Sequence, residues 1–275
     1  MSKITPSLTY YVEKDKYMLT NIKEIYHYRE MLKNLVVKDL RTRYKGSILG
    51  FFWTFLNPLL ILAVYTLVFS TVMRMGINNY SMFLFVVLLP WLFFANSVQA
   101  STMAIITNGG LVKKIYFPVV ILPLSVVLGN LVNYLFSLLI MVPALYFFNI
   151  QLTWAVAYFP ILLIIQLLLT LSFALLLSSL NVYFRDIEHM LNIFMMAWFY
   201  LTPVVYPVTL VPKQYMGLFF LNPLTTIILA YRDIFFYGKP PDLEALGYIG
   251  VFSMLFLIVA MFTFNHLKRS FAEEI

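Results

Sequence analysis

The chain has 275 residues, of which 62% are hydrophobic and only 11% are charged, with a formal net charge of +7. Soluble globular domains carry roughly 45–50% apolar and about 25% charged residues, so this chain has too little polar surface for a water-facing exterior. The composition excludes an ordinary soluble domain and indicates an integral membrane protein. The absence of cysteine excludes disulfides, thiol nucleophiles and thiolate metal sites.

The first 45 residues are polar and charged, so no cleavable signal peptide is expected. We expect a cytoplasmic lead-in over residues 1–21 and, over residues 22–45, an amphipathic helix lying on the inner membrane surface. The alternative for this helix is a soluble helix packed on another chain. Basic and aromatic side chains around its end favour the membrane interface. They are Arg41, Arg43, Tyr44, Lys45 and Trp53.

Six stretches of the remaining sequence are candidates for membrane spans, because crossing the hydrocarbon takes about 20 apolar residues in a helix. They are 47–73, 82–106, 119–148, 155–181, 190–206 and 246–267, with a turn at 149–153 between the third and the fourth. Most of the 19 Lys and Arg residues then lie in the cytoplasm, as the positive-inside rule requires. The prediction is an all-α integral membrane protein with six transmembrane helices in a domain over residues 46–270. A short tail at 271–275 follows, and both termini are cytoplasmic.

One apolar segment, at residues 216–231, is too short to span and is broken by Asn222 and Pro223. Irregular backbone at membrane depth has to be buried in protein or line a wet cavity. We therefore expect a re-entrant hairpin over residues 212–232, on the outer side between the fifth and sixth spans. Arg232 and Asp233 close it.

The sequence contains no phosphate-binding G-x-x-x-x-G-K-[ST] loop, no H-E-x-x-H and no G-x-S-x-G. Its three histidines lie far apart in the sequence, so metal binding is not expected. The predicted spans contain no Asp, Glu, Lys or Arg, whereas ion-coupled transporters usually keep at least one. If the chain moves a substrate, its energy is expected to come from another protein, and no cofactor is expected on the chain itself.

Four blocks resemble the membrane subunits of ATP-binding-cassette exporters that carry lipid-linked polysaccharides, O antigens and wall teichoic acids. They are RYKGSILGFFWTFLNPLL at 43–60, NGGLVKKIYFPVVILPLS at 108–125, RDIEHMLNIFMMAWFYLTPVVYP at 185–207 and NPLTTIILAYRDIFFYG at 222–238. The resemblance implies a permease of the bacterial plasma membrane that exports such a glycan or teichoic acid through a channel at a homodimer interface. It also implies two copies of a separate cytoplasmic ATPase subunit that holds ATP and Mg. Membrane lipids are expected partners, and nucleic acid is not.

The loop at residues 107–118 is predicted to be a short helix-like piece between breakers, with its lysines exposed. The resemblance implies that this piece is a coupling helix docked in a cleft of the ATPase. The alternative is a simple loop whose lysines only set the orientation of the chain. The residues assigned to coupling are Asn108, Gly109, Lys113, Lys114 and Tyr116.

Aromatic residues form one stripe on the first span and another on the fifth. They are Phe51, Phe55, Tyr65 and Phe69, followed by Phe194 and Trp198. Rigid apolar rings could offer a sliding surface to sugar rings, and the resemblance implies that these spans line the channel with aromatics. The alternative is packing against neighbouring helices or lipid.

For the hairpin, the resemblance implies a cap on the outer mouth of the channel, with Asn222, Pro223, Arg232 and Asp233 as gate residues. The alternative is a plug that only stabilises the bundle.

Three other functions remain open from the residues alone. A drug, lipid or antibiotic exporter of similar architecture would differ in its substrate. An ion-coupled secondary transporter would need buried ionisable residues. A membrane-embedded glycan-processing enzyme would need an acid–base pair at membrane level, for which the candidates are Asp186 with Glu188 and Arg232 with Asp233.

Overall fold

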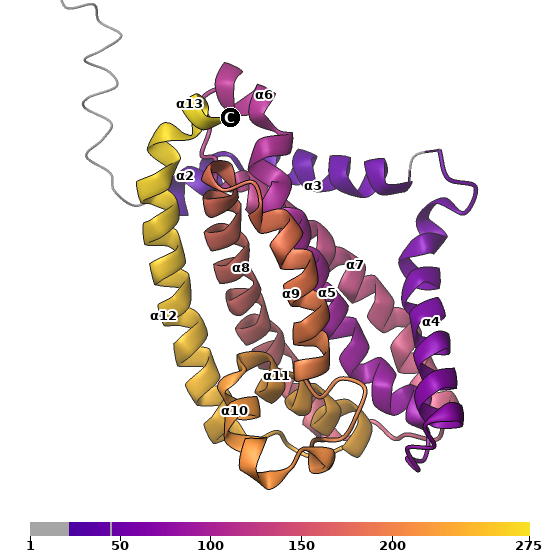
Figure 1. Cartoon of the computed structure of the whole chain (residues 1–275). Coiled ribbons are helices and arrows are strands. Elements are labelled where there is room, and N and C mark those ends of the chain that lie inside the picture. The colour runs from indigo at the N-terminus through magenta and orange to yellow at the C-terminus, as the bar shows by residue number, and fades with distance from the viewer. Residues whose placement is uncertain (1–21, 45) are drawn as a thin grey trace, which may run out of the picture.

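The computed structural model describes residues 22–44 and 46–275 (Figure 1). The expected lead-in at 1–21 and Lys45 lie outside the described residues, as do the side chains of Arg43, Tyr44 and Phe51. The described residues are mostly helical and contain no strand, which agrees with the predicted all-α class.

Among the described residues, five helices are long and apolar enough to cross a membrane. They are α4 Trp53–Thr66 continued by η2 Leu67–Val72, α5 Tyr80–Thr107, α7 Ile121–Phe147, η3 Trp154–Tyr158 continued by α8 Phe159–Tyr183, and α12 Leu243–Leu267 continued by η7 Lys268–Ser270 and α13 Phe271–Glu274. Their bounds lie close to those of the first four expected spans and the last. The turn expected at 149–153 is also present, and Asn149 adopts the left-handed conformation there, with φ of 57°.

The fifth expected span differs from the prediction. α9 Ile187–Leu201 has only 15 residues, or about 22 Å at 1.5 Å per residue, and ends before the prolines at 203 and 207. Beyond it, Lys213–Leu221 and Pro223–Tyr237 are bent by 99° against each other, so the pair is a broken span or a re-entrant loop. The short elements of this region are η4 Val208–Leu210, η5 Lys213–Tyr215, α10 Met216–Leu221, α11 Pro223–Arg232 and η6 Asp233–Tyr237. Elsewhere in the chain, the short element η1 Gly50–Phe52 precedes α4.

The N-terminal helix is broken in two, as α2 Ile22–His27 and α3 Arg29–Tyr44, and α3 runs across one end of the bundle (Figure 1). It crosses α7 closely because Gly129 has no side chain: a Cβ there would lie 3.0 Å from Oδ2 of Asp39. The short helix α6 Gly109–Lys114 lies at the same end, which we call the α6 end. The opposite end holds α10 and α11, and we call it the α11 end (Figure 1).

α5 is the central helix of the bundle. In its most apolar stretch 83% of the residues are buried, against 11% in the first span, so α4 leaves most of its surface for lipid or a second chain. A buried polar contact joins three helices here: the Gln166 amide of α8 donates to the Pro90 carbonyl at 2.7 Å and accepts from the Tyr231 hydroxyl at 2.6 Å. Hydrocarbon offers no hydrogen bonds to these polar groups, so they must bond to each other. Because these bonds form only when the helices are aligned, they set the register of α5, α8 and α11.

Candidate functional site

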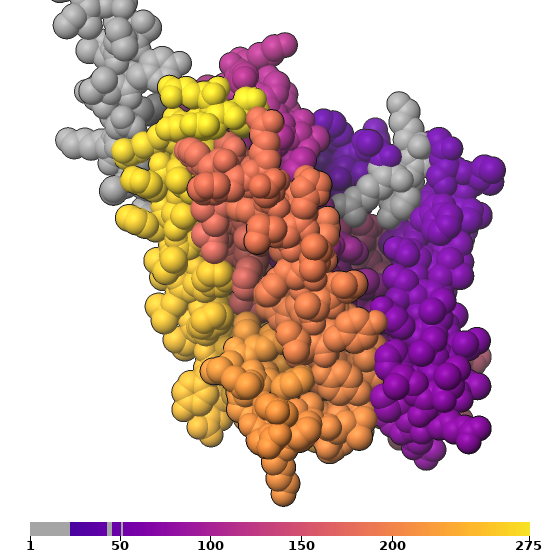
Figure 2. All heavy atoms as spheres, in the orientation of Figure 1, coloured from indigo at the N-terminus to yellow at the C-terminus, as the bar shows by residue number. Residues whose placement is uncertain are grey.

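α9 is held against the bundle by aromatic contacts. Phe199 stacks on Tyr65 of α4 and packs against Trp91 of α5, with centroids 5.4 Å apart in each pair. The preceding residue, Trp198, packs edge-on against Phe94 of α5 at 5.2 Å. Between α4 and α9, towards the α6 end, the surface is hollowed (Figure 2). The first and fifth expected spans therefore flank one hollow of the molecular surface.

The predicted channel-lining residues are placed differently from one another. Phe194 is 54% exposed, whereas Phe55, Tyr65 and Phe69 are half-buried and Trp198 is only 9% exposed. Within this chain the Trp198 ring is enclosed by neighbouring helices. A channel-lining role for all of these aromatics stays a prediction.

α5 and α9 also carry amide side chains within their apolar stretches, and a count of charged residues alone does not include them. The Gln99 amide of α5 donates to the Asn192 amide oxygen of α9 at 3.0 Å. Asn96 lies one turn from Gln99 on α5 and is exposed, although most of α5 is buried. Counting the carboxamides inside apolar segments, and not only the charged residues, would have indicated these polar side chains on α5 and α9.

Asn222 joins the end of α9 to the start of α11. Its Oδ1 accepts from the Trp198 indole at 3.0 Å and from the Leu224 backbone N–H at 3.1 Å, which caps α11. Its Nδ2 donates to the Thr202 hydroxyl at 2.9 Å. Pro223 follows at the first helical position, where its missing N–H has no cost. The break at the predicted gate residues is therefore a tightly bonded junction.

Arg232, one of the predicted gate residues, is buried in the protein, and its side chain is only 1% exposed. Nη2 donates to the carbonyls of Pro203 and Val204, each at 2.9 Å, and Nη1 reaches the Tyr206 carbonyl at 3.4 Å. These carbonyls belong to the non-helical segment that leaves α9, where no helix bond satisfies them. The guanidinium therefore holds this irregular backbone in place, and its burial follows from that role.

Asp233 bonds elsewhere, since its carboxylate lies 3.3 Å from the Lys239 ammonium. The neighbours Arg232 and Asp233 thus point into different surroundings and do not form an acid–base pair. Within residues 22–44 and 46–275, no group of three or more His, Asp or Glu side chains is placed to hold a metal ion.

The predicted coupling loop contains α6, and its exposed residues form one surface. Lys113 and Lys114 are exposed, and so are Ile115 and Tyr116, at 55% and 59%. Asn108 lies behind them and donates to the Ala104 carbonyl of α5 at 2.8 Å. We call Lys113–Tyr116 the α6 platform.

Contacts on three sides connect the α6 platform to the rest of the chain. The Tyr28 hydroxyl, between α2 and α3, donates to the Tyr116 carbonyl at 3.3 Å. Phe117 is buried beside Leu122 of α7. Gly109 meets the side chain of Ile275, so closely that a Cβ at 109 would collide with it. Movement of the platform would therefore reach the N-terminal helices and two long helices at once.

The predicted membrane-surface residues are partly described. Arg41 is exposed on α3, and Trp53 is 40% exposed, with its indole donating to the Ser47 hydroxyl at 3.0 Å. This bond ties the start of α4 to the connection from α3, and the anchoring role stays a prediction.

These features define a polytopic helical protein with a hollow at membrane depth and a basic platform at one end. The family model of ABC-2 type transporters matches residues 30–236, and the chain belongs to this family. It is 39% identical to the O-antigen export system permease protein RfbA of Myxococcus xanthus, over 94% of this chain and 100% of that protein. It is 33% identical to the protein of the same name from Klebsiella pneumoniae, over 89% and 94%. Identity to the polysialic acid transport protein KpsM of Escherichia coli is 26%, over 82% and 89%.

Proposed function

We propose that this chain is the permease subunit of an ATP-driven exporter that moves a lipid-linked polysaccharide across the bacterial plasma membrane. The observation that carries the proposal is the 39% identity to an O-antigen export permease over the whole of that protein. The names of the relatives favour a polysaccharide over a teichoic acid. Two copies of the chain form the channel, and each binds one copy of an ATPase subunit that holds the ATP and Mg.

The α6 platform is the proposed docking surface for that ATPase. It combines two adjacent ammonium groups with an exposed Ile and Tyr, a mixture of steering charge and apolar anchor that suits a partner of opposite charge. In this arrangement the α6 end and both chain termini face the cytoplasm, and α3 lies on the inner membrane surface.

Force transmission follows from the contacts of the platform. When the ATPase subunits close on ATP, each would shift α6, and Phe117, Tyr28 and Gly109 pass that shift to α7, to α2 and α3, and to the C-terminal helices. Packed helices move as bodies rather than deforming continuously, so the shift would rock the two permeases against each other. At the α11 end, Asn222 and Arg232 keep the outer segment attached to α9 while this happens.

Reconstitution tests the proposal. The chain is placed in proteoliposomes with and without its cognate ATPase subunit, and translocation of the lipid-linked glycan is measured with ATP. ATP-dependent translocation only with the subunit is the expected result. Translocation that persists without the subunit, or failure of the folded chain to bind it, overturns the proposal.

A charge reversal tests the docking surface separately. The double variant K113E/K114E is expected to weaken ATPase binding by about tenfold or more, because like charges at a complementary interface repel. Lys213→Glu is the matched control, since Lys213 is also exposed but lies at the α11 end. Equal binding of both variants would assign docking to another surface.

A further inference from the structure

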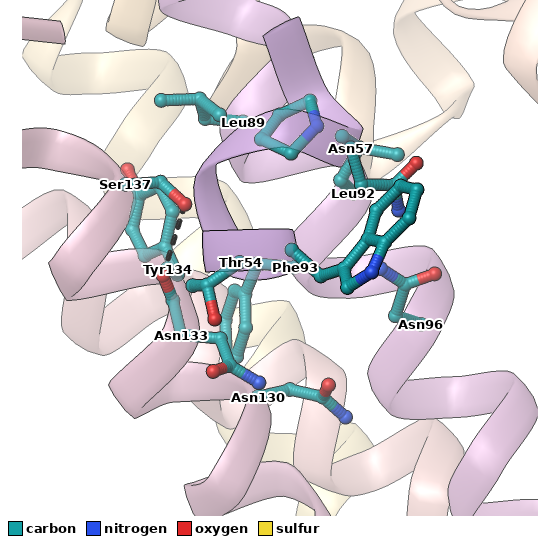
Figure 3. A pocket seen from close by; sticks show the side chains of 12 residues that line it. Thr54, Asn57, Leu89, Leu92, Phe93, Asn96, Asn130, Asn133, Tyr134 and Ser137 are labelled. Atoms are coloured by element: carbon teal, nitrogen blue, oxygen red, sulfur yellow. Dashed lines mark hydrogen bonds between the residues drawn. The ribbon is translucent and has the colours of Figure 1, made fainter. Parts of the chain in front are cut away.

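A cavity of about 260 Å³ lies between α4, α5 and α7, and no residue of α9 lines it (Figure 3). Six of the side chains around it are carboxamides or small hydroxyls. They are Thr54 and Asn57 of α4, Asn96 of α5, and Asn130, Asn133 and Ser137 of α7. We call this cavity the asparagine pocket.

The asparagine pocket lies at membrane depth. Asn96 is 11 residues from the last residue of α5, and Asn130 is nine residues from the first residue of α7, so they lie about 16 and 14 Å from the α6 end. A carboxamide in hydrocarbon is costly unless it is hydrogen-bonded. Neither Asn57 nor Asn96 bonds to a group of the described chain, and both are exposed. Their surroundings must therefore supply polar partners.

The side chains that line the pocket determine which kind of polar ligand could bind there. None of the lining residues is charged, so the pocket offers no counter-charge to a phosphate or a carboxylate. Carboxamides and hydroxyls both donate and accept hydrogen bonds, which matches the hydroxyl groups of a sugar. Phe93 and Tyr134, each 3% exposed and stacked on each other with centroids 5.5 Å apart, form a rigid apolar part of the pocket wall.

The size and position of the pocket agree with one sugar ring. It is several times the roughly 30 Å³ that one water takes in the liquid, and slightly below the roughly 300 Å³ of the smallest drug-sized pockets. Its lining includes Asn96, which is exposed and shares a face of α5 with Gln99, the residue that bonds to α9. The pocket therefore lies on a side of α5 that also contacts α9.

We propose that the asparagine pocket binds one neutral sugar ring of the exported glycan, beside the path of the polymer. This inference rests on the proposed function. It separates recognition of an uncharged sugar by amides of α4, α5 and α7 from whatever holds the charged phosphate of the lipid carrier. It also predicts selectivity for the sugar and tolerance towards the length of the lipid tail.

Binding is tested with the full chain in nanodiscs of phosphatidylethanolamine and phosphatidylglycerol, without glycoside detergent. The probes are octyl hexosides of different stereochemistry, with octyl phosphate as the tail-matched charged control, and the readout is tryptophan fluorescence, since Trp53 lines the pocket. At least one hexoside is expected to saturate the signal, and octyl phosphate is not. No saturation by any hexoside, or equal competition by octyl phosphate, overturns the inference.

Variants separate this site from others. Asn96→Leu and Asn130→Leu are each expected to weaken hexoside binding about tenfold, the effect of one lost hydrogen bond of ordinary strength. Asn192→Leu is the matched control, because Asn192 lies on α9, bonds to Gln99 and does not line the pocket. An unchanged melting temperature of each variant shows that it is folded. Hexoside binding that is equal in the pocket variants and the wild type overturns the inference.

The export assay distinguishes the two proposals. If the wild type exports glycan and Asn96→Leu does so with the same apparent KM, the pocket inference fails and the proposed function stands. If the wild type with its ATPase exports no glycan, the proposed function fails. A raised KM in Asn96→Leu, with ATPase binding unchanged, supports both.

Discussion

The guanidinium of Arg232 lies over the ring of Phe83, with Cζ 3.8 Å from the ring centroid, so a cation from α11 stacks on the first turn of α5. The same guanidinium bonds to backbone carbonyls of the segment after α9. A buried cation is stable only when such partners replace water. This one side chain therefore connects the central helix, the bent pair and the end of α9.

Arg232→Lys is expected to destabilise the protein by about 2–4 kcal/mol, because an ammonium loses the planar stack and part of the carbonyl bonding. Thermal unfolding in nanodiscs measures this. Lys239→Ala removes a cation that is 60% exposed in the same region and is expected to cost less than about 1 kcal/mol. Equal stability of Arg232→Lys and wild type would mean that the Arg232 side chain does not hold the segment after α9 in place.

Asn222→Ala is expected to cost more than an ordinary helix cap. Asp242 caps α12 through the Ala245 N–H alone at 3.1 Å, and its replacement by Ala should cost about 1 kcal/mol. Asn222 caps α11 and also bonds to Trp198 and Thr202, so its loss should cost about 2–3 kcal/mol. Comparative thermal unfolding of the two variants checks this, and similar values would mean that the bonds to α9 carry little free energy.

Gly109→Ala is expected to push the side chain of Ile275 off α6, at a cost of about 1–3 kcal/mol from overpacking. Gly110→Ala is the neighbouring control, because a Cβ there meets nothing within 4 Å. Stability and glycan translocated per ATP are the measurements. Adding Ile275→Ala to Gly109→Ala should restore both, and no rescue would show that the two residues act independently.

Gly129→Val is expected to displace α3 from α7, because the carboxylate of Asp39 lies against the space that the new side chain would fill. We expect a loss of about 1–3 kcal/mol and faster amide hydrogen exchange over residues 29–44. Gly250→Ala, whose Cβ would make only an ordinary 3.6 Å contact with Ile165, should leave this exchange unchanged. Unaltered exchange in Gly129→Val would mean that α3 is held by other contacts.

The sequence by itself determined the class of the protein and the place of most long helices. Long apolar runs without charge are stable as helices in the hydrocarbon of the membrane. The chain can turn only where polar residues interrupt these runs, as at 149–153. The four sequence blocks also pointed to the family to which the chain belongs. Local composition carries this information because each helix satisfies the hydrogen bonds of its own backbone, so a span does not depend on partners elsewhere in the chain.

Only the tertiary structure decided which side chains meet. The sequence predicted Arg232 and Asp233 only as residues that close the hairpin, and the burial of Arg232 depends on carbonyls nearly 30 residues earlier in the chain. Trp198 belonged to an aromatic stripe, but the packing of α9 on α5 turned its ring inward. Asn57, Asn96 and Asn130 are unremarkable one by one and line one pocket because three helices bring them together. Such contacts depend on how the helices pack, and no local sequence pattern encodes that packing.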